Sequence, residues 1–268
     1  MTATVVRPEV LRAGQPGGAC VVFAHGLEDG WASWRPLVRL VEPAWRAVAL
    51  DLPWRAGNDY GWRRHSAAAW LSAGLDAVDG PVDLLVAHSF GANAALELMA
   101  GGGLPQVGAV ALVCPLYRPP RAPVTWEMFD LARQRFEAHI RDGVRARLGP
   151  RALATGPDVL DRMSAKAVER VGPAGLLTAF DRFVASAELD LEAIGHRVIV
   201  LAGGHDPTLR ERSARLLGER MARATVLVDP ELDHFCHIRM PDAVLGHLCG
   251  FLGATSDAPP TSQEATRR

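Results

Sequence analysis

The strongest constraint on this sequence is the alternation of short apolar runs with amphipathic stretches along most of its length. Near-continuous apolar runs are typical of buried parallel strands, and the stretches between them are long enough to be crossover helices. The pattern therefore predicts an α/β fold with a mostly parallel central sheet and flanking helices. The predicted strands are 19–24, 47–50, 82–87, 107–113, 197–202 and 225–228, with an antiparallel edge strand at 4–11, and the predicted helices are 33–41, 66–78, 91–100, 209–221 and 240–252.

The alternation is interrupted once, between residues 113 and 197, where the sequence is helical in character. In 131–148, apolar side chains recur every four residues, as on one face of an amphipathic helix. Pro150, Gly156–Pro157 and Gly172–Pro173 then divide the remainder into about three further helical pieces. We therefore predict a core of residues 1–115 and 191–253, a helical cap inserted at 116–190, and a disordered tail at 254–268.

Composition excludes several classes of protein. The formal net charge is −1, so there is no overall field that attracts nucleic acid or an anionic membrane. The four cysteines are widely spaced without a Cys-x-x-Cys pair, which favours reduced thiols in a cytosol over a disulfide framework. Arg7, Glu9 and Arg12 interrupt the N-terminal segment, which is therefore not typical of a signal peptide. We expect a cytoplasmic protein whose partner is a small-molecule substrate, not nucleic acid or a membrane.

The most informative motif, Ala87-His88-Ser89-Phe90-Gly91, leads from a predicted strand directly into a helix. A serine at the tip of such a sharp turn needs small residues two positions before and after it, and Ala87 and Gly91 meet that need. The start of the helix also directs backbone N–H groups toward developing negative charge. Ser89 is therefore the predicted nucleophile, and capping of the helix is the alternative role of this serine.

A second motif, Phe23-Ala24-His25-Gly26-Leu27, ends the predicted strand 19–24. A glycine directly after a strand lets the next N–H point into the cleft beyond the carboxyl ends of the strands, where open parallel sheets bind ligands. The N–H groups of Leu27 and Phe90 are the predicted oxyanion hole. We interpret His25 as a structural residue that supports the turn.

An acid and a base follow two later strands. Asp206 comes after the strand 197–202 and is the predicted orienting acid, with capping of the helix 209–221 as a second, compatible role. His234 lies in the loop before the final helix, and a neutral imidazole is the natural general base near pH 7. We prefer it to His237 and His205 because the loop gives it free approach to the sheet edge. The His234-x-x-His237 spacing with Cys236 suggests a metal site, but no further ligand cluster supports one, so we predict neither a metal nor a cofactor.

These motifs together resemble those of the α/β-hydrolase superfamily. The matching text is FAHGL, DLP at 51–53, AHSFGANAA, LAGGHDP and DHF, which spans most of the chain outside the predicted cap and tail. The resemblance implies that Ser89 is the nucleophile, His234 the base and Asp206 the acid, with Leu27 and Phe90 as the oxyanion hole. It also implies that the insertion is the helical cap that family members place after the sixth strand, over the substrate pocket.

The chain departs from the family pattern at two places, after DLP, where 54–58 replaces a glycine-rich continuation, and at Asp233, where relatives often have glycine. Haloalkane dehalogenases in the superfamily use an aspartate nucleophile, so Ser89 argues against that chemistry. Some relatives carry the acid after the sixth strand, but this chain has Val-Cys-Pro there, at 113–115, which leaves Asp206 the better candidate.

We therefore expect a serine hydrolase that cleaves a carboxylic ester or thioester of a small apolar-to-acidic metabolite through an acyl-enzyme. The alternatives are carbon–carbon bond hydrolysis, acyl transfer or cyclisation on the same scaffold, and a non-catalytic ligand-binding protein. Six arginines in 131–151 suggest an acidic substrate or an acyl group on a carrier protein, although a solvated helix face is the simpler interpretation. The aromatic residues expected to line the pocket are Trp31, Trp126, Phe129 and Phe235.

Overall fold

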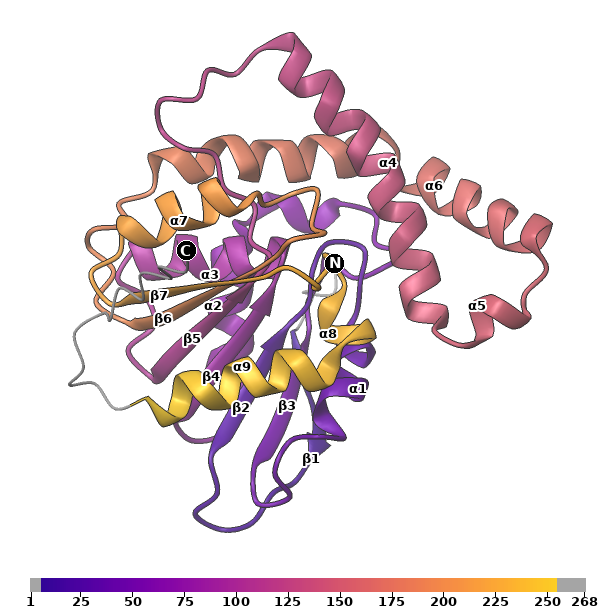
Figure 1. Cartoon of the computed structure of the whole chain (residues 1–268). Helices are drawn as coiled ribbons and strands as arrows, with labels where there is room; N and C mark the ends of the chain where they lie inside the picture. Colours follow the sequence, from indigo (N-terminus) through magenta and orange to yellow (C-terminus); the bar gives the residue numbers. More distant parts are fainter. Residues whose placement is uncertain (1–5, 255–268) are drawn as a thin grey trace, which may run out of the picture.

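A seven-stranded sheet organises the described residues, 6–254, in this computed structural model (Figure 1). The strand order is β1-β3-β2-β4-β5-β6-β7, with β1 antiparallel to β3 and every other neighbouring pair parallel. The strands are β1 Arg7–Arg12, β2 Cys20–Ala24, β3 Arg46–Asp51, β4 Val82–His88, β5 Val107–Val113, β6 Arg197–Gly203 and β7 Ala224–Asp229. The predicted fold class is confirmed, and the predicted edge strand is β1. Thr4 and Val5, which the prediction included in that strand, lie outside the described residues.

Alternate side chains of the buried strands enter two separate apolar clusters, one on each face of the sheet. In β2, Val22 and Ala24 belong to one cluster, and Val21 and Phe23 belong to the other. Helices α2 (Ala67–Asp76), α3 (Phe90–Ala100) and α7 (Glu211–Glu219) cover the first face, whereas α1 (Arg35–Val38) and α9 (Pro241–Gly253) cover the second (Figure 1). Burial on both faces explains why the strands read as continuous apolar runs.

Two of the predicted helices differ from those in the structure, one in its type and the other in where it begins. The predicted helix 33–41 is a 3-10 turn, η1 (Trp31–Trp34), followed by only the single short helix α1. The predicted helix 209–221 begins at Glu211, because Arg210 is still extended. Asp206 is therefore not the cap of α7.

The insertion between β5 and β6 is entirely helical in its regular structure. It contains α4 (Trp126–Leu148), α5 (Arg151–Ala154), α6 (Pro157–Ala185) and the 3-10 turn η3 (Ser186–Glu188). The predicted breaks occur: α5 follows Pro150, α6 begins at Pro157, and Gly172 interrupts α6 with a φ of 53°, which glycine adopts readily. All four elements fall within the predicted cap 116–190, whose exact boundaries stay a prediction.

The insertion passes over the edge of the sheet where the parallel strands end, with α4 and α6 side by side there (Figure 1). This edge carries the loops that follow β2, β4, β6 and β7. No helix within residues 6–254 is long and apolar enough to cross a membrane. The predicted disordered tail lies outside the described residues, apart from Ala254.

Candidate active site

Ser89 occupies the sharp turn between β4 and α3. Its backbone has a φ of 50° and a ψ of −118°, a conformation that costs a non-glycine residue about 1–3 kcal/mol. Two contacts hold the turn: Ser89 N–H donates to the Val113 carbonyl over 2.8 Å, and Gly91 packs so closely that a Cβ there would lie 2.6 Å from the His25 carbonyl oxygen. The sequence requirement for small neighbours therefore has a direct steric origin in the adjacent strand β2.

Asp206 and His234 lie together beside this turn, although 28 positions separate them. Asp206 Oδ1 is 3.0 Å from His234 Nδ1, and both side chains are almost completely buried. Asp206 Oδ1 also accepts from the Thr208 N–H at 2.8 Å and the Thr208 hydroxyl at 2.7 Å. Burial opposes ionisation of Asp206, but His234 and the Thr208 hydrogen bonds outweigh it and hold the pKa of this carboxyl below its ordinary value.

The other nitrogen of the His234 ring, Nε2, is buried and has no hydrogen-bond partner within the described residues. A ring held by a carboxylate at Nδ1 and free at Nε2 has the arrangement that a general base needs. The competing histidines lie elsewhere: His205 is exposed, and His237 is in α8 (Cys236–Arg239), where its ring faces Asp29.

The residues predicted to form the oxyanion hole border the same cavity as Ser89, and their role stays a prediction. Leu27 and Phe90 both border the cavity described below, together with Ser89. Within residues 6–254, neither the Leu27 N–H nor the Phe90 N–H donates a hydrogen bond to a backbone carbonyl of a turn, loop or helix cap. His25 supports the turn, as predicted from the sequence: its Nε2 accepts from Leu52 N–H at 3.2 Å and its carbonyl accepts from the Trp54 indole at 2.9 Å.

A cavity of about 350 Å³ lies above Ser89, between the sheet edge and the insertion. Its walls are mainly apolar, and most of them come from one face of α4 and from the C-terminal half of α6. The polar residues that line the cavity are Ser89, His139, Thr208, Arg135 and Arg210. The apolar lining residues are Leu27, Phe90, Leu116, Met128, Leu131, Ala132, Phe136, Leu176, Ala179, Phe180, Phe183 and Pro207.

Comparison with known proteins agrees with this geometry. The profile described as "Alpha/beta hydrolase family" matches residues 21–246, which include the strands, the turn at Ser89 and the loop of His234. The chain belongs to the alpha/beta hydrolase family. A search of the curated proteins finds no match.

Solved structures of other alpha/beta hydrolases share the fold at low sequence identity. A bromoperoxidase from Bacillus anthracis is 18% identical, with 93% of this chain and 95% of that chain covered and a TM-score of 0.68. An enol-lactonase from Burkholderia xenovorans LB400 is 17% identical, with coverages of 93% and 96% and a TM-score of 0.61. A 2-hydroxy-6-oxo-6-phenylhexa-2,4-dienoate hydrolase from Rhodococcus sp. strain RHA1 is 18% identical, with coverages of 94% and 96% and a TM-score of 0.62. At these identities the likeness is one of fold.

None of the four aromatic residues expected to line the pocket of this alpha/beta hydrolase borders the cavity. Trp126 is 81% exposed, because it lies on the side of α4 opposite the cavity-lining stripe that starts at Met128. Phe129, at the edge of that stripe, packs its ring 5.1 Å from Phe180. Trp31 is beside β1 under the guanidinium of Arg35.

Phe235, the last of the four, is buried behind the site and stacks on His139 with 4.8 Å between the ring centres. His139 comes from α4 and brings the insertion into contact with the proposed base, since its ring lies 4.4 Å from that of His234. Burial and the neighbouring His234 lower the pKa of His139 to about 3, so it is neutral at ordinary pH. No pattern in the sequence pointed to this residue.

His88, the residue before Ser89, is also part of the site. Its Nε2–H donates to the His234 carbonyl over 2.8 Å, so the turn that presents Ser89 also holds the loop of His234. Burial and the nearby histidines hold the pKa of His88 well below its ordinary value, and the ring is neutral. The sequence analysis did not assign a role to His88, and its position directly before Ser89 in the motif was the one indication that it belongs to the site.

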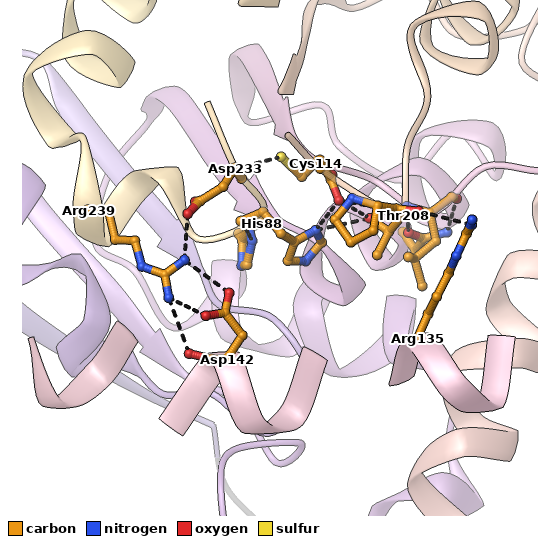
Figure 2. A network of polar contacts seen from close by, with 12 residues as sticks. His88, Cys114, Arg135, Asp142, Thr208, Asp233 and Arg239 are labelled. Carbon is orange, nitrogen blue, oxygen red and sulfur yellow. Dashed lines mark hydrogen bonds and ion pairs between the residues drawn. The ribbon is translucent and has the colours of Figure 1, made fainter. Parts of the chain in front are cut away.

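Ion pairs fasten the insertion to the edge of the sheet. Figure 2 shows Arg239 of α8 between Asp233, next to His234, and Asp142 on α4. On the other side, Arg170 of α6 lies 2.6 Å from the buried carboxylate of Glu28. These contacts hold α4 and α6 beside the edge of the sheet, where both helices line the cavity.

Proposed function

We propose that this protein is a serine hydrolase that cleaves carboxylic esters or thioesters with an apolar acyl group. The observation that carries the proposal is the 3.0 Å contact between Asp206 and His234 beside a serine held in a strained turn at the floor of an apolar cavity. A buried carboxylate, an imidazole and a hydroxyl in this arrangement provide an acid, a base and a nucleophile.

The chemistry follows from these roles. His234 Nε2 removes the proton of the Ser89 hydroxyl as its oxygen attacks the substrate carbonyl, and Asp206 stabilises the imidazolium that forms. The N–H groups of Leu27 and Phe90 stabilise the oxyanion, each worth about 3–4 kcal/mol of barrier. His234 then gives its proton to the leaving alcohol or thiol. In the second half of the reaction His234 removes a proton from a water molecule that attacks the acyl carbonyl, the bond to Ser89 Oγ breaks, and the proton returns to Ser89 as the carboxylic acid leaves.

The cavity supports the choice of acyl group. A volume of about 350 Å³ is at the small end of the roughly 300–1,000 Å³ that small-molecule sites enclose. The apolar walls favour a short to medium hydrocarbon chain or a ring, which would lie between α4 and α6. Arg135 and Arg210 at the wall provide positive charge for an acidic end of the substrate or of its carrier.

The proposal is tested by labelling with a fluorophosphonate probe and by hydrolysis of p-nitrophenyl esters from acetate to octanoate. We expect stoichiometric modification of Ser89, and a loss of kcat of roughly 10⁴-fold or more in Ser89→Ala. Ser213→Ala, on α7 and outside the cavity lining, is the matched control and should keep full turnover. Unchanged turnover in Ser89→Ala would remove Ser89 from the mechanism.

The same measurements separate the alternatives. Labelling of Ser89 without turnover of any ester or thioester favours carbon–carbon bond hydrolysis, acyl transfer or cyclisation, because these use the same nucleophile. Neither labelling nor turnover favours a ligand-binding protein that has kept the scaffold without the chemistry.

A further inference from the structure

Three buried side chains converge behind the proposed active site without forming hydrogen bonds to one another. Asp29 is in the loop after β2, His88 ends β4, and His237 is in α8; each is at most 2% exposed. One ligand atom from each lies within 4.8 Å of the other two. Both Asp29 oxygens, His88 Nδ1 and both His237 nitrogens have no hydrogen-bond partner within residues 6–254. Unpaired buried polar atoms are rare in folded proteins, and a cluster of them calls for a physical explanation.

The cluster has fewer hydrogen atoms than acceptors: of the five unpaired atoms, only one nitrogen of a neutral His237 ring would carry a hydrogen. The His234 carbonyl can only accept, so His88 Nε2 carries the proton of its neutral ring, and His88 Nδ1 presents a lone pair. The Asp29 carboxylate presents only lone pairs as well. Arg147 is the nearest cationic group outside the cluster, and its Nη1 lies 3.9 Å from Asp29 Oδ1. His237 Nε2 lies 3.6 Å from Asp29 Oδ2. Both distances are longer than a hydrogen bond.

We propose that Asp29, His88 and His237 form a binding site for one divalent transition-metal ion, with Zn²⁺ as the preferred ion. Two imidazoles and a carboxylate are donors that zinc takes in proteins, at about 2.0–2.2 Å. Tetrahedral bonds of that length set the donor atoms roughly 3.3 Å apart. Asp29 Oδ2 and His237 Nε2 are already 3.6 Å apart. The ligand atom of His88 lies within 4.8 Å of the other two, so each of these two distances would have to shorten by at most about 1.5 Å when the ion binds.

The surroundings are compatible with a zinc site of three protein ligands, in which a water molecule would take the fourth position. The hydrogen bond from His88 Nε2–H to the His234 carbonyl is the outer contact that metal-binding histidines usually make, and it leaves Nδ1 as the nitrogen available to bind the ion. The Trp34 ring packs 4.6 Å from that of His237 and covers one side. None of the three ligands borders the substrate cavity.

The ion would join three loops that carry the proposed catalytic groups. Asp29 is two residues from Leu27, His88 precedes Ser89, and His237 follows His234 by three positions. A bound ion would therefore stiffen the turn of the oxyanion hole, the turn of the nucleophile and the loop of the base. Of the two histidines in the His234-x-x-His237 motif, only His237 would bind the ion, because the His234 ring faces Asp206 instead.

The test uses the full chain, stripped of metal with a chelator and dialysed, then titrated with ZnCl₂ while bound zinc is measured by equilibrium dialysis. We expect one zinc per chain, and a rise in Tm of about 5–10 °C at a free zinc concentration of 100 times Kd. Replacement of zinc by Co²⁺ should produce the visible absorption of a four-coordinate N/O site. Less than stoichiometric zinc at micromolar concentrations, without a change in Tm, would overturn the proposal.

Variants locate the ion and do not depend on enzymatic activity. Asp29→Asn and His237→Gln should each weaken zinc binding at least about 100-fold, whereas His65→Gln, which replaces an exposed histidine, should bind as wild type does. Asp206→Asn should also retain zinc, because it belongs to the neighbouring group Cys114–Asp206–His234. Wild-type affinity in both Asp29→Asn and His237→Gln, or loss of zinc in Asp206→Asn, would place the ion elsewhere and overturn the assignment. Circular dichroism of each apo variant verifies that it is folded.

Discussion

Replacement of Gly91 by alanine tests how closely the turn at Ser89 is packed against β2. A Cβ at this position would lie 2.6 Å from the His25 carbonyl oxygen and 2.9 Å from that of Ala24, both of them backbone atoms at the end of a central strand. An ordinary contact begins near 3.4 Å, so α3 or the end of β2 would have to move by roughly 0.5–0.8 Å.

The free energy of unfolding should fall as a result. Overpacking of this kind costs about 1–3 kcal/mol, and alanine recovers up to about 1 kcal/mol through its higher helix propensity. We expect a net loss of about 1–2 kcal/mol, or roughly 2–8 °C in Tm, measured by urea and thermal unfolding. Turnover of p-nitrophenyl esters should fall by about tenfold or more, because the same movement displaces the N–H of Leu27.

Gly246→Ala is the matched control. Gly246 is exposed within α9, and a Cβ there would meet nothing within 4 Å, so the substitution should stabilise the protein by about 0.5–1 kcal/mol without affecting turnover. If Gly91→Ala proved as stable and as active as Gly246→Ala, the close packing of the turn, and with it the steric reason for a small residue after Ser89, would be refuted.

Two further predictions concern the insertion. The pKa of His139 is about 3 in the folded protein, below the ordinary 6.5, so only the unfolded chain takes up this proton as pH falls from 6.5 toward 3, and stability is lost over that window. Between pH 7.5 and 5.5, His139→Gln should therefore lose about 1 kcal/mol less stability than wild type in urea titrations; equal losses would contradict a neutral His139. Phe183→Ala should enlarge the cavity and raise kcat/KM for the octanoate ester relative to the butyrate ester by several-fold, whereas Trp126→Ala, at an 81% exposed position, should leave that ratio unchanged. A shift of equal size in both variants would show that the exposed tryptophan contacts the substrate after all.

Much of the fold could be predicted because the controlling patterns are local. A strand buried on both faces has to be apolar along its length, so β4 and β5 could be recognised without knowledge of their neighbours. The helix breaks in the insertion follow from proline and glycine, whose backbone preferences do not depend on the rest of the protein. The helix expected at 33–41 was wrong because its apolar pattern spans two different kinds of turn.

The contact between Asp206 and His234, and the position of Ser89 at the end of β4, could be predicted for a different reason. Each of these residues follows a parallel strand, and parallel strands of one sheet present their carboxyl ends at the same edge. Topology therefore brings these residues near one another, and the 3.0 Å contact of Asp206 with His234 needed only suitable loops. Thr208, which holds the Asp206 carboxylate through two hydrogen bonds, belongs to those loops, and sequence reasoning missed it.

Local sequence patterns were enough to locate the strands, the turns and the chemically active residues that follow the strand ends, because backbone periodicity and steric limits act over a few residues. The residues that line the cavity, and the histidines that contact one another, depend instead on how the helices pack in three dimensions. Those contacts depend on how α4 is rotated and seated over the sheet, which is set by distant partners such as Asp142 with Arg239. Trp126 and His139 lie on the same helix, yet one is exposed and the other touches His234, because a helix presents its faces in directions that only its packing fixes.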